Sequence, residues 1–234
     1  MKRLIVLFTI AVGLNSCDSL KQLPGLPGGP GLTEAEAGQG IKQALGNGLV
    51  KAVLQLNKED GFFKDLIYKV LLPPDAQKIE NTLRNLGMGK MVDKAILQIN
   101  RGAEDAVGTA KPIFVDAITS MTLTDAINIV RGGDHSATDY FRNKTLDKLT
   151  AAFSPVIKNS LDKVSATKYY GDVVNTYNNF PTTRNKINPD LPSYVTGKAT
   201  DALFDLIAKE EKNIRENPVA RTTEILKKVF GQKW

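Results

Sequence analysis

Apolar residues recur every three or four positions along most of this chain, the spacing that places them on one face of an α-helix. The pattern starts after Thr33, which with Glu36 fits a capping box. In this motif each of the two side chains accepts a hydrogen bond from the backbone amide of the other residue at the helix start. No alternating run bounded by turn residues predicts a strand. Helices are predicted over residues 33–59, 62–70, 75–86, 88–110, 112–121, 122–131, 136–164, 167–179, 193–217 and 218–230. We therefore expect an all-α fold, a single multi-helix domain of roughly eight to ten helices over residues 33–234.

Proline and glycine mark the breaks between these helices. Pro73 and Pro74 interrupt the chain because proline lacks an amide donor and restricts the residue before it. Gly87 is placed to end a helix in a left-handed conformation, and Pro155 is expected to kink or restart its helix. Residues 181–192 hold three prolines and few apolar residues, which predicts a surface loop or lid.

The N-terminus has a different pattern. Two basic residues precede an almost uninterrupted apolar run over residues 4–14, and Ser16 lies directly before Cys17, the single cysteine. This order is typical of a secretory signal, and the cysteine after the cleavage point resembles the lipobox of bacterial lipoproteins. The run is shorter than the about 20 apolar residues that span a bilayer. We expect residues 1–16 to be removed and Cys17 to be lipidated; the alternative is an ordinary signal peptide with a chance cysteine.

The segment that follows supports this interpretation. Residues 17–32 interleave Pro24, Pro27 and Pro30 with glycines, so the chain is both extended and free to turn. We interpret this segment as a Pro/Gly-rich tether. At about 3.1 Å per residue it could hold the domain tens of ångströms from a bilayer.

Composition narrows the possible functions. The 234-residue chain is 42% hydrophobic and 24% charged, which suits a packed domain, and its formal net charge is +6. Basic residues are not gathered with aromatic residues into one patch, so nucleic acid is not an expected partner.

Few residues could carry out catalysis. The chain has one histidine, and lipidation would leave it without a free thiol, which excludes zinc sites built from Cys and His. Two matches to S-x-x-K, at residues 160–163 and 165–168, lack the K-T-G partner and the sheet of penicillin-binding proteins. We expect no metal and no cofactor, and a binding role rather than an enzyme.

The polar cluster around residues 132–142 is one candidate binding site. Two glycines precede Asp134 and His135 where one helix ends and another begins, and a helix start with free amides attracts anions. Thr138 and Arg142 lie four apart on one helix face, so both could hold an anion. The structural alternative is that the glycines end one helix, Ser136 caps the next, and the arginine pairs with a carboxylate.

Glu104 is the second candidate, because it lies among alanines in the predicted helix 88–110 and could point inward. There it could meet Arg215 or Arg221 of the C-terminal helices. Inward carboxylates can act as acid and base or bind a cation, and they can also form buried ion pairs that fix helix register.

Three stretches carry a family resemblance: residues 100–104 (NRGAE), residues 132–142 (GGDHSATDYFR) and the tail over residues 194–231. In this order they resemble a family of bacterial lipoprotein-like proteins known only as a domain of unknown function, number four-one-nine-seven. The resemblance covers nearly all of the chain after the signal. It implies an all-helical envelope domain and supplies no reaction, ligand or catalytic residue.

These observations favour a membrane-anchored lipoprotein of a Gram-negative cell envelope that acts as a non-catalytic binding or scaffold module. The partners would be the membrane, through the lipid, and an envelope protein, glycan or lipid. The domain would lie on the periplasmic or cell-surface side, with the outer membrane favoured over the inner. The alternatives are an envelope hydrolase that uses carboxylates and a carrier of an apolar ligand.

Overall fold

The computed structural model describes residues 33–231, apart from residues 86, 88, 164, 180, 182–185 and 189. The signal and tether predictions therefore lie outside the described residues. All regular structure in the described part is helical, which confirms the all-α prediction. The helices are α1 (Glu34–Leu56), α2 (Gln77–Asn85), α3 (Gly89–Val107), α4 (Ala110–Thr119), α5 (Leu123–Arg131), α6 (Ser136–Lys163), α7 (Ala166–Asn178), α8 (Leu191–Glu216) and α9 (Glu224–Phe230), with short 3-10 turns at Pro74–Ala76 and Pro218–Ala220.

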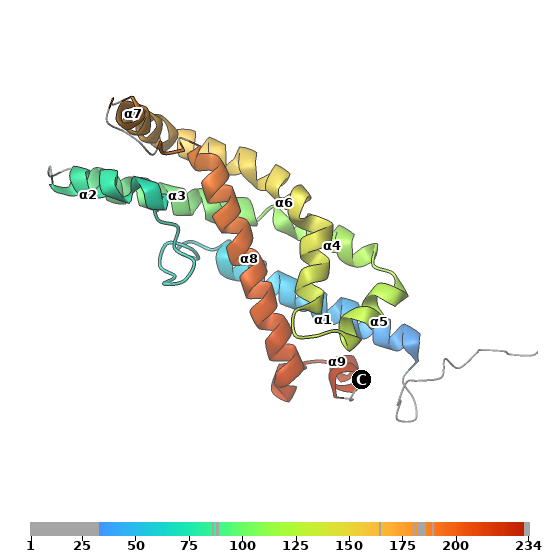
Figure 1. Ribbon diagram of the computed structural model, residues 1–234. Helices are drawn as coiled ribbons and strands as arrows, with labels where there is room; N and C mark the ends of the chain where they lie inside the picture. The colour runs from blue at the N-terminus through green and yellow to red at the C-terminus, as the bar shows by residue number, and fades with distance from the viewer. Residues whose placement is uncertain are drawn as a thin grey trace, which may run out of the picture.

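The helices form an elongated bundle (Figure 1). Helix α6 packs against both α3 and α8, and α1 packs against α4, α5, α8 and α9. Helices α2 and α7 lie at one end, and α5 and α9 lie at the other. Helix α8 runs between these two ends (Figure 1) and packs against α1, α3, α6 and α7.

Three phenylalanines form the centre of the core. Phe114 of α4 meets Phe141 of α6 and Phe204 of α8 edge to face, with ring centroids 5.9 and 6.2 Å apart. All three side chains are buried. Edge-to-face pairs add about 0.5–1.5 kcal/mol beyond the burial of apolar area, so this cluster stabilises the point where α4, α6 and α8 meet.

Small residues on α3 let α6 approach closely. Ala103 and Ala106 are fully buried, and a Cβ added to Gly102 would lie 3.1 Å from the Cβ of Ser160 on α6. This separation is tighter than ordinary van der Waals contact. The absence of a side chain at Gly102 therefore lets α3 and α6 pack closely at this point.

The local signals at helix ends were predicted well. Thr33 and Glu36 form the capping box expected at the start of α1, and Gly87 has the predicted left-handed conformation, with φ +79°. Of the two alternatives expected at Pro155, a kink or a restart, the restart is wrong, since α6 runs unbroken through this residue. Helix α8 begins at Leu191, two residues earlier than expected.

The largest error is the helix expected over residues 62–70, where the structure has turns at residues 62–64 and 66–68 and no helix. For this reason the expected eight to ten helices are only approximately right. Two side chains, Glu104 of α3 and Asp65 within the segment, bond four of its backbone amides. Glu104 Oε1 accepts from the N–H groups of Phe62 and Phe63 at 3.1 and 3.3 Å, and Asp65 accepts from those of Ile67 and Tyr68.

Asn100 completes this arrangement. Its buried side chain accepts from the N–H of Val70 at 2.8 Å and donates to the C=O of Val70 at 2.9 Å. It also donates to the C=O of Ile96 at 2.7 Å. One amide thus holds the segment before α2 against α3.

In the described part, no single helix is both long and apolar enough to cross a membrane. One bent pair, residues 89–119 with residues 123–131 at 102°, meets the criteria by length and composition alone.

Replacing Asn100 with alanine should destabilise the protein by about 2–3 kcal/mol, because both backbone groups of Val70 lose their partner in a buried place. The measurement is the free energy of unfolding in urea. Gln98→Ala on the same helix is the control and should cost less than about 1 kcal/mol. Equal losses in the two variants would contradict the role assigned to Asn100.

Candidate functional site

The predicted helix start at Ser136 is present, but its free amides have a partner within the protein. The carboxylate of Glu211, on α8, accepts from the N–H groups of Ala137 and Thr138, each at 2.9 Å. The Thr138 hydroxyl also donates to it at 2.8 Å. Glu211 is 7% exposed. The amides that the sequence offered to an external anion are therefore satisfied by this carboxylate.

Arg215 completes this arrangement, which we call the Glu211–Arg215 clamp. Its guanidinium donates to Glu211 Oε1 at 2.8 Å and to the hydroxyl of Ser136 at 2.7 Å. It also donates to the C=O of Ile129 at 2.7 Å, at the end of α5. The clamp ties α8 to the junction between α5 and α6. Ser136 donates its hydroxyl to this same carbonyl and does not cap an amide of α6.

The expected pairing of Glu104 with Arg215 or Arg221 is wrong. Glu104 pairs with Arg101, three residues before it, at 2.6 Å and accepts from the amides of residues 62 and 63. Arg221 donates to the carbonyls of Ile214 and Arg215. Glu104 and Arg215 therefore belong to separate clusters that each join distant parts of the chain.

The remaining predicted residues are not gathered around one opening. Asp134 and His135 are exposed on the loop before α6. Thr138 is buried against Glu211, whereas the Arg142 guanidinium lies 4.5 Å from the centre of the Phe204 ring and 3.8 Å from Asp201. Thr138 and Arg142 thus have different partners.

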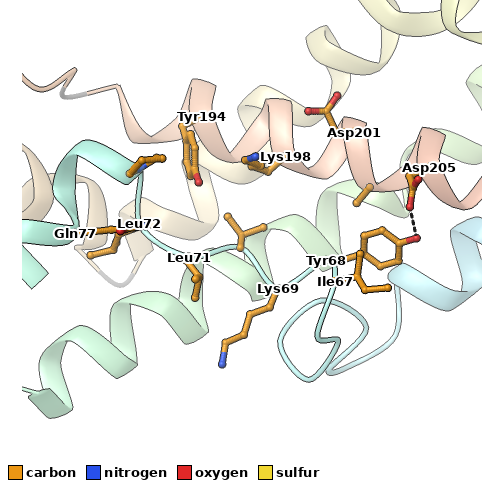
Figure 2. Close-up of a pocket in the computed structure, with 13 residues that line it drawn as sticks. Ile67, Tyr68, Lys69, Leu71, Leu72, Gln77, Tyr194, Lys198, Asp201 and Asp205 are labelled. Atoms are coloured by element: carbon orange, nitrogen blue, oxygen red, sulfur yellow. Dashed lines mark hydrogen bonds between the residues drawn. The ribbon is translucent and has the colours of Figure 1, made fainter.

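A groove between residues 67–77 and α8 is the candidate site that the structure adds; we call it the α8 groove. Its volume is about 480 Å³. Figure 2 shows the segment 67–72 along one wall and side chains of α8 along the other. The α8 wall consists of Tyr194, Lys198, Asp201, Ala202 and Asp205.

One end of the groove is fixed by three side chains that bond to one another. The Tyr68 hydroxyl donates to Asp205 at 2.6 Å (Figure 2). Lys209 donates to the Tyr68 oxygen at 2.8 Å and pairs with Asp205 at 2.8 Å. The bond from Lys209 lowers the pKa of Asp205, and burial raises the pKa of Tyr68. Both pKa values move away from neutrality, so neither group suits acid–base catalysis near pH 7.

The other end of the groove carries a cation. The Lys198 ammonium lies 5.8 Å from the centre of the Tyr194 ring and has no carboxylate partner among the described residues. Burial raises the pKa of Tyr194 above its usual value, so its hydroxyl is protonated and able to donate at neutral pH. This end of the groove therefore offers a hydroxyl donor and an ammonium group without an ion-pair partner in the described part.

Sequence reasoning missed the groove because it predicted a helix over residues 62–70. The α8 wall had a signal: Tyr194, Lys198, Asp201 and Asp205 recur at helical spacing on one face. The opposite wall had none, because long-range side-chain contacts shape it. Within the described residues, no group of three or more His, Cys, Asp or Glu could hold a metal ion.

Glu211→Ala should cost about 3–5 kcal/mol of stability, because it leaves Arg215 and two amides without their buried partner. The matched control is Glu210→Ala, which removes a carboxylate paired with exposed Lys51 and should cost about 0–1 kcal/mol. Urea unfolding of both variants measures the difference. If the two variants are equally stable, the clamp does not hold α8.

Tyr68 should ionise only above pH 10, because its folded pKa is raised. Because the pKa of Tyr68 is higher in the folded than in the unfolded protein, protonated Tyr68 stabilises the fold at pH values below its pKa in the unfolded protein. This contribution to the free energy of unfolding is lost as pH rises through its pKa in the folded protein. Alkaline titration of tyrosinate absorbance, compared with Tyr68→Phe, isolates this group. Burial raises the pKa of Tyr170 to about 12, so Tyr170 should ionise at a higher pH than Tyr68. Ionisation of Tyr68 at or below pH 10 would contradict the geometry.

Comparison with known proteins gives one match. The family model described as "Protein of unknown function (DUF4197)" matches residues 31–231. No curated protein and no solved structure matches the chain. Because the model covers most of the chain, the protein belongs to the DUF4197 family of proteins of unknown function.

Proposed function

We propose that this protein is a lipid-anchored binding module of the bacterial cell envelope that presents the α8 groove to a partner. The signal-like N-terminus, Cys17 and the Pro/Gly-rich tether support the anchor. The tether leads into Thr33 at the start of α1, so the domain would lie on the aqueous side of the membrane. The outer membrane is favoured over the inner.

The observation that carries the binding role is the groove itself. Its volume of about 480 Å³ falls within the range of small-ligand sites, about 300–1,000 Å³. It combines apolar residues, such as Leu71 and Leu72, with a few polar groups at its two ends. Sites that fix the orientation of a ligand have this composition. The partner would be an envelope protein, glycan or lipid.

The carboxylate hydrolase is less well supported. Such an enzyme needs two carboxyl groups free to act as acid and base. Glu104 and Glu211, the two buried acids in the described part, each accept two backbone amides and bond an arginine. Asp205 is paired with Lys209. These carboxylates are therefore engaged in contacts that stabilise the fold.

A carrier of an apolar ligand is also less well supported. A small pocket between α1 and α4 has a volume of about 50 Å³ and is lined by residues such as Leu49, Val53 and Phe114. An acyl chain needs several times this space. The α8 groove is larger and has charged groups at its ends.

Replacing Cys17 with serine removes the thiol that would be acylated. The variant should either accumulate as precursor or appear in the soluble fraction, whereas wild type should fractionate with membranes. Ser16→Ala, which keeps a small residue before the cysteine, is the control and should behave like wild type. Wild-type fractionation and maturation of the Cys17→Ser variant would contradict lipidation.

Photo-crosslinking in cells tests the groove without knowledge of the partner. A photoreactive phenylalanine analogue at Ile67, on the groove and 71% exposed, should give an adduct whose mass identifies the partner as protein, glycan or lipid. The same analogue at Val219, 85% exposed and outside the groove, is the control and should give none. Absence of adducts at Ile67, or equal adducts at both positions, would contradict the proposal.

A further inference from the structure

We propose that the α8 groove binds an extended peptide segment of a partner protein, which adds as a strand to the free backbone edge of Leu71. This inference rests on the proposed binding function and names the ligand class.

The first observation is the extended segment before α2. Residues 69–71 have no helical or turn structure. Asn100 bonds both the N–H and the C=O of Val70, at 2.8 and 2.9 Å, as a neighbouring strand would. Successive residues of an extended chain direct their N–H and C=O groups to opposite edges. The backbone groups of Leu71 therefore point away from Asn100.

The second observation is that this opposite edge is unpaired. The N–H and C=O groups of Leu71 have no hydrogen-bond partner in the described part of the chain. Leu71 is 48% exposed, whereas Val70 and Leu72 are buried and anchor the segment on both sides. Figure 2 shows the segment between α3, which carries Asn100, and α8. The edge opposite Asn100 is thus the edge along the groove.

The dimensions of the groove fit such a ligand. Its α8 wall extends from Tyr194 to Asp205, which is about 16 Å at 1.5 Å per helical residue. An extended chain advances about 3.3 Å per residue, so about five residues would fill the groove. A helical ligand would be about 10–12 Å wide and would leave the edge of Leu71 unpaired.

The side chains around the groove indicate which peptide would bind. Ile67 and Leu71 are large exposed apolar residues at its rim, and fully exposed Leu66 extends this surface. They would contact apolar side chains at alternate positions of an added strand. Lys198 lacks a carboxylate partner in the described part, so an acidic side chain or a C-terminal carboxylate would lie near it. Asp205 already has Lys209.

Selection of displayed random short peptides against the full-length protein in detergent tests the inference. Recovered peptides should share alternating apolar residues and an acidic end. Leu71→Pro removes the amide donor together with the leucine side chain and fixes φ, and it should weaken binding by about tenfold or more. Leu71→Ala keeps the backbone and should change affinity less. Lys198→Glu should weaken peptides with an acidic end.

A second test changes the selected peptide and leaves the protein unchanged: each peptide amide is N-methylated in turn and the affinity is measured. N-methylation should abolish binding at one residue, the one whose amide donates to the C=O of Leu71, and should have little effect at its two neighbours, whose amides point to the other edge of the peptide. Failure to select peptides, or uniform sensitivity to N-methylation, would overturn the inference. If Ile67 still cross-links a partner in cells, the proposed binding function stands and only the ligand class is wrong. If neither cross-links nor peptides are found, both proposals fail.

Discussion

The carboxylate of Glu211 at the start of α6 is the contact on which much of the rest depends. A buried charge is costly unless it is paired and hydrogen-bonded, and this one accepts two backbone amides, a hydroxyl and a guanidinium. It also lies at the positive end of the α6 dipole. Because Arg215 bonds the end of α5 as well, one residue pair joins α5, α6 and α8. Glu104, paired with Arg101, likewise joins α3 to the turn at residues 62 and 63 by accepting from their amides.

The α8 groove follows from these two clusters. The Glu211–Arg215 clamp and the contact of Phe204 with Phe114 position α8 against the bundle. Glu104 and Asn100 hold the opposite wall on α3. Tyr68 then joins the two walls through Asp205. A groove held in this way is preformed, so a ligand would lose little free energy in ordering it.

The sequence predicts what depends on neighbouring residues and misses what depends on distant ones. The capping box at Thr33 and the left-handed Gly87 involve residues close in the chain, and the structure has them. Glu211 meets amides more than seventy residues away, and no local pattern indicates that partner. Within residues 62–70, where a helix is expected, side chains of α3 bond the amides of residues 62, 63 and 70, and no local pattern indicates these partners. Only the α8 wall of the groove had a periodic signal.

Amide hydrogen exchange tests most directly whether long-range side chains fix the backbone in this way. First-turn amides of a helix normally lack a partner and exchange fast. The structure predicts slow exchange at Ala137 and Thr138, held by Glu211, and at Val70, held by Asn100. The neighbouring amide of Leu71 should exchange quickly, because it has no partner in the described part. Fast exchange at Ala137 and Thr138, as at exposed His135, would contradict the account.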